Sequence, residues 1–158
     1  MNVYVSIRNL ATALALAASA STVAAPYPGT INTASEQANM KTVRDLYAAI
    51  FVARDPKVAL TYLGPEYIQH ATGLADGKAG LVRRIGEIAR DSPQISYDIK
   101  HITAEGNLVA MMTNIQRTPG SLGVALFHIY RLNDGKIVEH WEAAQDVPKT
   151  SANSNGIF

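Results

Sequence analysis

Histidine is the residue type in this 158-residue sequence best suited to chemistry, because the chain contains no cysteine. The absence of cysteine excludes disulfides, thiolate nucleophiles and cysteine-based metal sites. The sequence also lacks a glycine-rich phosphate loop, a G-x-S-x-G elbow and an H-E-x-x-H helix. Chemistry must therefore come from histidine, carboxylates, tyrosine or a pocket itself. The four histidines all fall within or at the end of predicted strands: His70, His101, His128 and His140.

The last predicted hairpin brings two of these histidines onto facing strands. Asn133-Asp134-Gly135 suits a three-residue turn with Leu132 opposite Lys136. That register sets His128 directly opposite His140 on one face, about 5 Å apart at Cβ. Two imidazoles so placed can share a proton, hold a ligand oxygen or begin a metal site.

A shorter turn gives a different register. A two-residue turn at Asp134-Gly135 pairs His128 with Trp141 and puts His140 on the other face of the sheet. We favour the three-residue turn and therefore the facing pair.

The surroundings of each histidine suggest different roles. His128 lies in an apolar strand, where an unpaired polar group is costly, so it needs a partner that a core neighbour or a pocket can supply. His70 ends a strand before a glycine-containing loop, which fits a pocket rim or the surface equally well. His101 is expected on the surface. Three nearby aromatic residues are most simply explained by packing: Tyr67, Tyr130 and Trp141.

Helical periodicity precedes the strands. Three helices are expected, the first opening with a capping box at Thr33-Ala34-Ser35-Glu36 and the others with caps at Asp55 and Asp76. A short strand is expected at 67–70, and four more at 94–103, 108–118, 124–132 and 136–146. Helices followed by an antiparallel meander predict an α+β fold, with the helices on one face of a curved sheet and a ligand cavity at one end.

The first residues are predicted to be an export signal. Arg8 and the apolar run from Leu10 to Ala20 are typical of a signal peptide, and the run is too short for a permanent membrane anchor. We expect a signal peptide at 1–24, a linker at 25–34 and one domain at 35–158, exported to the periplasm or secreted. The balance of 14 basic against 13 acidic residues argues against a nucleic-acid partner.

Several motifs together resemble the SnoaL-like polyketide cyclase family of the nuclear transport factor 2-like superfamily. The resemblance spans about Glu36 to Phe158. It rests on Tyr67-Ile68-Gln69-His70, Gly73-Leu74-Ala75-Asp76-Gly77, Phe127-His128-Ile129-Tyr130-Arg131, Asp134-Gly135-Lys136-Ile137, Glu139-His140-Trp141-Glu142 and Gln145-Asp146-Val147-Pro148.

This resemblance implies a cone-shaped, cystatin-like α+β barrel, often a homodimer built on the open sheet. Characterised members of the family catalyse intramolecular aldol condensation without a cofactor. An acid/base residue removes a proton next to a carbonyl, and the enolate attacks a second carbonyl. A small hydrophobic carbonyl compound is the ligand that such a pocket implies.

One position departs from the family pattern. Family members commonly read Asp-Ile-Phe-Arg where this chain has His128-Ile129-Tyr130-Arg131, and that Asp is the acid/base in the cyclases. Histidine has a reference pKa of about 6.5, so a neutral imidazole can act as a base. We therefore predict His128 as the base and His140 as its orienting partner or as a donor to the enolate. Substrate contacts are expected from His70, Tyr67, Tyr130 and Trp141.

Two alternatives stay open on the sequence alone. One is an exported protein that binds a small molecule without catalysis. The other is a metal site built from His128, His140 and His70, with Glu142 as a further ligand. Our leading hypothesis uses no metal and no cofactor.

Overall fold

The computed structural model describes residues 32–158 of the chain. The predicted signal peptide at 1–24 and residues 25–31 of the predicted linker lie outside the described residues. Within the described range, no helix has the length and apolar character needed to cross a bilayer.

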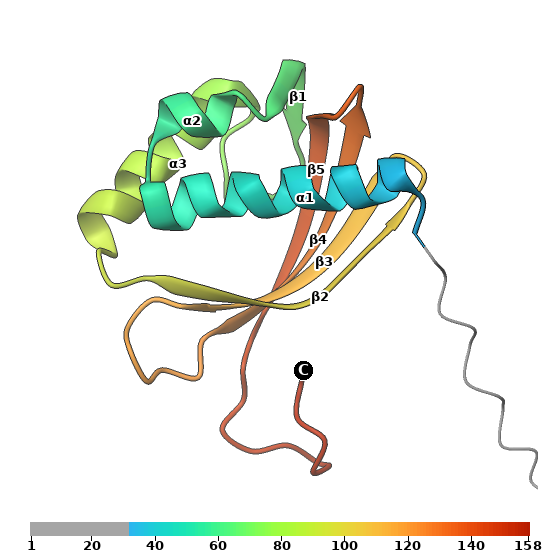
Figure 1. Cartoon of the computed structure of the whole chain (residues 1–158). Helices are drawn as coiled ribbons and strands as arrows, with labels where there is room; N and C mark the ends of the chain where they lie inside the picture. The colour runs from blue at the N-terminus through green and yellow to red at the C-terminus, as the bar shows by residue number, and fades with distance from the viewer. Residues whose placement is uncertain (1–31) are drawn as a thin grey trace, which may run out of the picture. The chain divides into compact units, whose positions relative to one another are not determined.

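The helices precede the strands along the chain, except that β1 lies between α2 and α3, as the sequence predicts. The helical elements are α1 (Ala34–Ala48), the π-helical turn η1 (Ala49–Ala53), α2 (Pro56–Leu60) and α3 (Gly77–Asp91). The strands are β1 (Leu63–Gln69), β2 (Ser96–Glu105), β3 (Leu108–Gln116), β4 (Val124–Asn133) and β5 (Lys136–Asp146). They form one sheet in the order β1-β5-β4-β3-β2, antiparallel except where β1 runs parallel to β5. Figure 1 shows this sheet curving beneath the helices, which confirms the predicted α+β cone.

The helices begin where their capping residues predict. The Thr33 side chain accepts the backbone N–H of Glu36, and the Glu36 carboxylate accepts the N–H of Thr33, which completes the capping box. Asp55 caps α2 by accepting the backbone N–H groups of Lys57 and Val58, and Asp76 caps α3 by accepting that of Gly77. Helix α2 ends at Leu60, and β1 starts at Leu63, earlier than the strand predicted at 67–70.

The turn between β4 and β5 differs from the three-residue loop that we favoured. Asn133 pairs with Lys136, so the turn contains only Asp134 and Gly135, at φ 47° and 70°. Positive φ at both central residues makes a type I′ turn, whose twist suits a hairpin. The favoured register, with His128 opposite His140, is therefore wrong.

A β-bulge in β5 returns His140 to the inner face of the sheet. Leu132 pairs with Ile137, but Arg131 pairs with Glu139, so Val138 is an extra residue. One extra residue reverses the alternation of every side chain beyond it. As a result His140 pairs with Tyr130, and His128 pairs with Glu142. The two histidines share the inner face, as expected, although they are diagonal neighbours.

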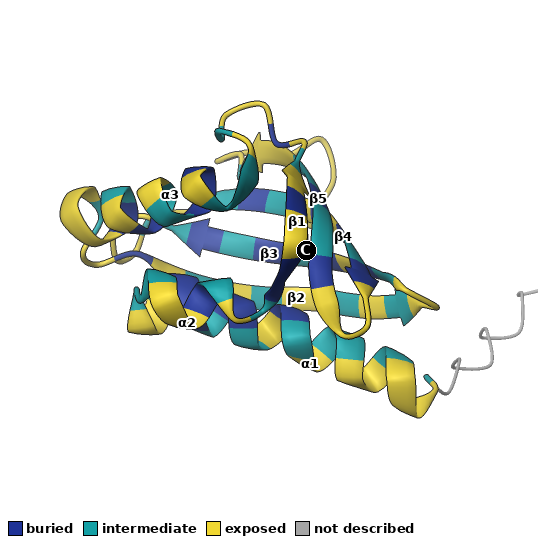
Figure 2. Cartoon of the chain, turned by 90° about the horizontal axis from the view of Figure 1, so that it is seen from above, coloured by how far each residue is buried: buried dark blue, intermediate teal, exposed yellow. Residues whose placement is uncertain are grey.

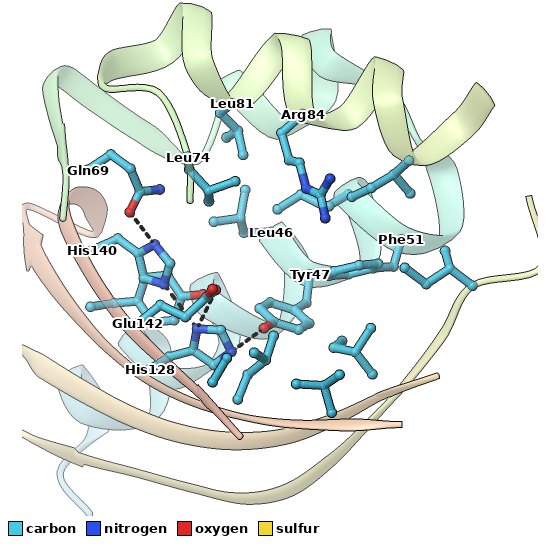
Figure 3. A pocket seen from close by; sticks show the side chains of 18 of the residues that line it. Leu46, Tyr47, Phe51, Gln69, Leu74, Leu81, Arg84, His128, His140 and Glu142 are labelled. Carbon is cyan, nitrogen blue, oxygen red and sulfur yellow. Dashed lines mark hydrogen bonds and ion pairs between the residues drawn. The ribbon is translucent and has the colours of Figure 1, made fainter. Parts of the chain in front are cut away.

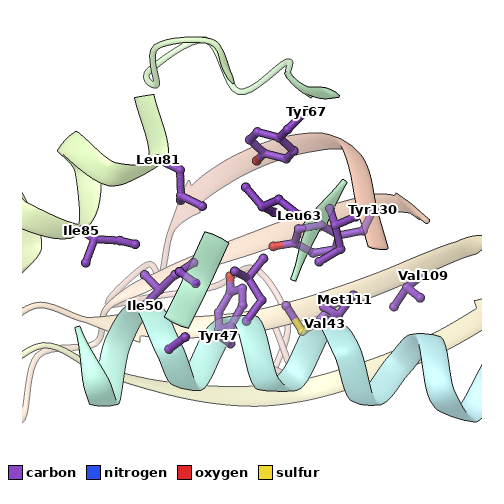
Figure 4. Packing of buried hydrophobic residues seen from close by; sticks show 14 of the residues in the cluster. Val43, Tyr47, Ile50, Leu63, Tyr67, Leu81, Ile85, Val109, Met111 and Tyr130 are labelled. Carbon is purple, nitrogen blue, oxygen red and sulfur yellow. The ribbon is translucent and has the colours of Figure 1, made fainter. Parts of the chain in front are cut away.

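The core lies between the inner face of the sheet and the helices. Along β4, His128, Tyr130 and Leu132 are buried, whereas Phe127 and Ile129 alternate onto the outer face and are exposed. Figure 4 shows the inner side chains meeting those of α1 and α3, and Figure 2 shows the exposed residues on the outer sides of these helices. The most deeply buried large residues are Leu46, Ile85, Leu132 and Ile137.

Two glycines of α3 are predicted to respond oppositely to alanine. A Cβ on buried Gly80 would overlap the backbone carbonyl of Ala75, whereas a Cβ on exposed Gly86 would enter open space. We expect Gly80→Ala to lower the free energy of unfolding by about 1–3 kcal/mol because of this overpacking. Gly86→Ala should raise it by up to about 1 kcal/mol through helix propensity. Urea unfolding measures both, and a Gly80→Ala protein as stable as wild type would contradict the close approach.

Candidate functional site

A cavity of about 180 Å³ lies between the inner face of the sheet and helices α1 and α3 (Figure 3). Its wall is mostly aliphatic and aromatic, which suits a small apolar compound. The polar and charged side chains in the wall are Tyr47, Tyr67, Gln69, Arg84, Arg117, His128, Tyr130, His140 and Glu142.

Strand periodicity explains why these side chains meet. Residues two apart on a strand share a face. Three strands contribute such pairs: Tyr67 and Gln69 from β1, His128 and Tyr130 from β4, and His140 and Glu142 from β5. Helix α1 supplies the buried Tyr47 from the opposite side.

A chain of hydrogen bonds crosses the wall of the cavity. The Tyr47 hydroxyl lies 2.6 Å from His128 Nε2. His128 Nδ1 lies 3.0 Å from His140 Nε2, and His140 Nδ1 lies 2.9 Å from Gln69 Oε1. All four nitrogens of the two buried imidazoles are therefore engaged (Figure 3).

One backbone amide determines which groups donate and which accept in this series of hydrogen bonds. Gln69 Oε1 accepts the N–H of Ala71 at 2.9 Å, which fixes it as an acceptor. His140 Nδ1 must then donate to Gln69, which leaves Nε2 of the neutral ring as an acceptor. His128 Nδ1 consequently donates to His140, and His128 Nε2 accepts from Tyr47. Both histidines are assigned as neutral Nδ1–H tautomers by this hydrogen-bond logic.

Burial keeps the histidines neutral. It lowers the pKa of His128 to about 3, helped by His140, and lowers the pKa of His140 to about 4, helped by His70. Burial also raises the pKa of the hydroxyls of Tyr47, Tyr67 and Tyr130 above the usual range. At neutral pH the cluster thus contains uncharged imidazoles and protonated phenols.

Glu142 is the carboxylate of the cluster. Its Oε2 lies 3.5 Å from His128 Nδ1, and its side chain is mostly buried. Burial raises the pKa of Glu142, while the positive charge of Arg84 acts in the opposite direction. A half-desolvated carboxylate facing a cavity is suited to accepting a proton near neutral pH.

Tyr67 offers a hydrogen-bond donor to the same cavity. Its hydroxyl oxygen accepts from Gln69 Nε2 at 2.9 Å. Within residues 32–158, the structure shows no acceptor for the hydroxyl hydrogen of Tyr67, so this hydrogen remains available to a ligand oxygen. Gln69 therefore orients both the histidine pair and the tyrosine.

The structure separates the predicted site residues into two groups. His128, His140, Tyr67 and Tyr130 line the cavity. His70 and Trp141 lie outside its lining and stack on each other with ring centroids 4.9 Å apart. The His70 ring also contacts Glu139 of β5 at 2.9 Å, and both side chains are partly exposed. His101 is exposed, as expected.

Five polar or charged residues of the cavity were not among the acid/base and substrate-binding positions predicted from the sequence: Tyr47, Gln69, Arg84, Arg117 and Glu142. The alternation of strands carried a usable signal for two of them. Gln69 shares a face with Tyr67, and Glu142 shares one with His140. The sequence patterns suggest Glu142 only as a metal ligand.

The residues that could hold a metal ion are His128, His140 and Glu142, whose potential ligand atoms lie within 4.8 Å of one another. His70 is not in this group. His128 Nδ1 and His140 Nε2 are hydrogen-bonded to each other, so a cation could bind both only after that bond was broken. The arrangement shown by the structure is a better fit to hydrogen bonding than to coordination.

Solved structures with the same architecture confirm the fold. One is described as a SnoaL-like polyketide cyclase from Jannaschia sp. CCS1 (18% identity, 73% of this chain and 91% of that chain, TM-score 0.61). A second is IdmH from Streptomyces antibioticus, described as a polyketide cyclase (20% identity, 67% and 91%, TM-score 0.58). A third is described as a ketosteroid isomerase from Kribbella flavida (13% identity, 75% and 86%, TM-score 0.60). A comparison with curated protein sequences finds no significant relative.

The family follows from the sequence match. Residues 43–140 match the model of the SnoaL-like domain, and the chain belongs to this family. The match includes His128 and ends at His140, so Glu142 lies just beyond it. The predicted resemblance is thereby confirmed.

Proposed function

We propose that this protein is a cofactor-independent enzyme that moves a proton next to a carbonyl group of a small, largely apolar compound. The observation that carries this proposal is the position of Glu142, a mostly buried carboxylate in an otherwise aliphatic and aromatic cavity. An aldol cyclase, an isomerase and a dehydratase all share this first step.

The proposed step uses two cavity residues. The Glu142 carboxylate accepts the proton from the carbon beside the carbonyl, and the C–H electron pair forms the carbon–carbon double bond of an enolate. The carbonyl π electrons move to oxygen, where the Tyr67 hydroxyl donates a hydrogen bond to the developing charge. The proton then returns to carbon, or the enolate attacks a second carbonyl.

The histidine pair takes a positioning role in this proposal. We predicted His128 as the base from the sequence, but in the structure its Nε2 already accepts from Tyr47 and its Nδ1 donates to His140. A base needs a free lone pair that faces the substrate. The Glu142 carboxylate lines the cavity, and its contact with the histidine pair is the His128 N–H, 3.5 Å from Oε2.

Deuterium exchange distinguishes this enzyme from a protein that only binds its ligand. We would incubate the protein in D₂O with 4-oxo-4-phenylbutanoate, 4-oxononanoate and their methyl esters, and follow the protons beside the ketone by NMR. Exchange above the rate in buffer supports the enzyme. Saturable binding without exchange supports a protein that only binds its ligand, a role for which the apolar cavity is also suited.

We also propose that two copies associate through the outer face of the sheet. Phe127 and Ile129 are about half exposed there, and they border a groove with Met112 and Trp141. An apolar surface of this kind on an open sheet is well suited to a second copy. Sedimentation should show a dimer that Ile129→Lys converts to a monomer. Val52→Lys, on an exposed position of η1, is the control, and a monomeric wild type would contradict the proposal.

A further inference from the structure

Two arginines stand out in the wall of the cavity. Arg84 is partly buried and comes from α3, whereas Arg117 is exposed and follows the end of β3; both line a space that is otherwise mostly apolar. Glu142 is the only carboxylate in the lining given by residues 32–158. With the histidines neutral, the lining carries two positive charges and one potential negative charge.

The position of Arg84 on its helix is unusual. Leu81, Arg84 and Ile88 recur at helical spacing and all line the cavity, so Arg84 occupies the apolar stripe of α3. Figure 3 shows its guanidinium directed into the cavity, across from His128 and Glu142. The Arg84 side chain is 36% exposed, and the desolvation of its remaining surface is costly unless an anion meets the guanidinium.

Arg84 forms only a long ion pair with Glu87, and Glu87 also contacts Arg83. Arg84 Nη1 lies 3.4 Å from Glu87 Oε2, while the other oxygen of Glu87 lies 3.8 Å from Arg83. Arg117 has no carboxylate within 4.0 Å among residues 32–158. The cavity therefore presents guanidinium groups with hydrogen-bond donors to spare.

We propose that the substrate is an apolar keto acid whose carboxylate is bound by Arg84 and Arg117, with its ketone directed toward Glu142. This inference rests on the proposed function, because it places a substrate in the same cavity. One substrate carboxylate would balance the excess positive charge of the lining. Repulsion from Glu142 favours the orientation in which the carboxylate lies at the arginines and the carbon to be deprotonated lies at Glu142.

The test compares each acid with its uncharged methyl ester. Isothermal titration with 4-oxo-4-phenylbutanoate should give a dissociation constant roughly 10- to 100-fold lower than with methyl 4-oxo-4-phenylbutanoate, since charge-assisted hydrogen bonds are worth that much. Arg84→Met keeps the apolar stem and should remove most of this preference. Arg83→Met is the matched control, because Arg83 is the adjacent, largely exposed arginine and does not line the cavity.

The acid-to-ester ratio separates anion binding from the influence of Arg84 on Glu142. Loss of the arginine charge changes the rate of proton transfer for both probes. Only a loss of carboxylate binding changes the ratio of the dissociation constants of acid and ester. Equal affinity for acid and ester, or an unchanged ratio in Arg84→Met, would overturn the inference. If wild type exchanges the ester and shows no preference for the acid, the inference is wrong but the proposed function is supported. If the acid binds tightly and neither probe exchanges, the carboxylate site is supported but the proposed function is wrong.

Discussion

Glu142→Gln is expected to lower the rate of deuterium exchange by about 10²- to 10⁴-fold, the usual contribution of a positioned general base. Glutamine keeps the size and most of the polarity of the side chain but cannot accept the proton. Probe binding should change much less than the exchange rate, because the apolar wall and the arginines remain. NMR exchange rates and titration calorimetry measure the two effects separately.

Glu139→Gln provides the control for this substitution. Glu139 lies on the same strand but on the outer face of the sheet, where it pairs with Arg131 and His70 rather than lining the cavity. Its replacement should leave exchange near the wild-type rate. Equal losses in the two variants would point to a general disturbance of β5 and would contradict a specific role of Glu142.

Acid should destabilise the fold through the buried histidine pair. The pKa of His128 falls from 6.5 to about 3 in the folded chain, and the pKa of His140 falls to about 4. Below pH 6.5 the two histidines are protonated in the unfolded chain but remain neutral in the folded chain. The free energy of unfolding therefore falls with falling pH until the folded histidines titrate. The expected loss between pH 7 and pH 4.5 is about 3–5 kcal/mol.

Other groups around the pair modify this loss without reversing it. Glu142 has a raised pKa, so it takes up its proton earlier in the folded state and partly offsets the effect. Arg84 faces the pair as a permanent charge, and the tyrosines that face it, namely Tyr47, Tyr67 and Tyr130, stay protonated because their pKa values are raised.

Urea unfolding at several pH values measures the loss. In His128→Asn, one of the two titrating groups is gone, so the fall in stability between pH 7 and pH 4.5 should be about half that of wild type, whatever the stability at pH 7. His101→Asn, at an exposed position, should keep the full dependence. An undiminished dependence in His128→Asn would show that the pair does not titrate as proposed.

The sequence predicted the fold because its local signals agreed with one another. Capping residues at Thr33, Asp55 and Asp76 mark the helix starts in the structure. The turn residues between the strands separate β2 to β5 at nearly the predicted bounds. The π-helical end of the first helix and the parallel pairing of β1 with β5 depend on tertiary packing, which no local pattern encodes.

The site was predictable only in part, because one bulged residue decides its geometry. Turn chemistry alone allowed either face for His140, and neither register that we considered included the extra residue Val138. Gly64 of β1 lies against Val138, close enough that a Cβ there would overlap the valine. This contact joins strands that are distant in the sequence. The same is true of the hydrogen bond from Tyr47 on α1 to His128 on β4, which a strand pattern cannot reveal.

The pH dependence of deuterium exchange in wild type and Glu142→Gln tests the central claim most directly. We expect exchange by wild type to rise with pH through a single ionisation above the ordinary glutamate value, because burial raises the pKa of Glu142. Glu142→Gln should show no such rise. A Glu142→Gln protein that exchanges its probe at the wild-type rate, with the same pH profile, would contradict the assignment of Glu142 as the base.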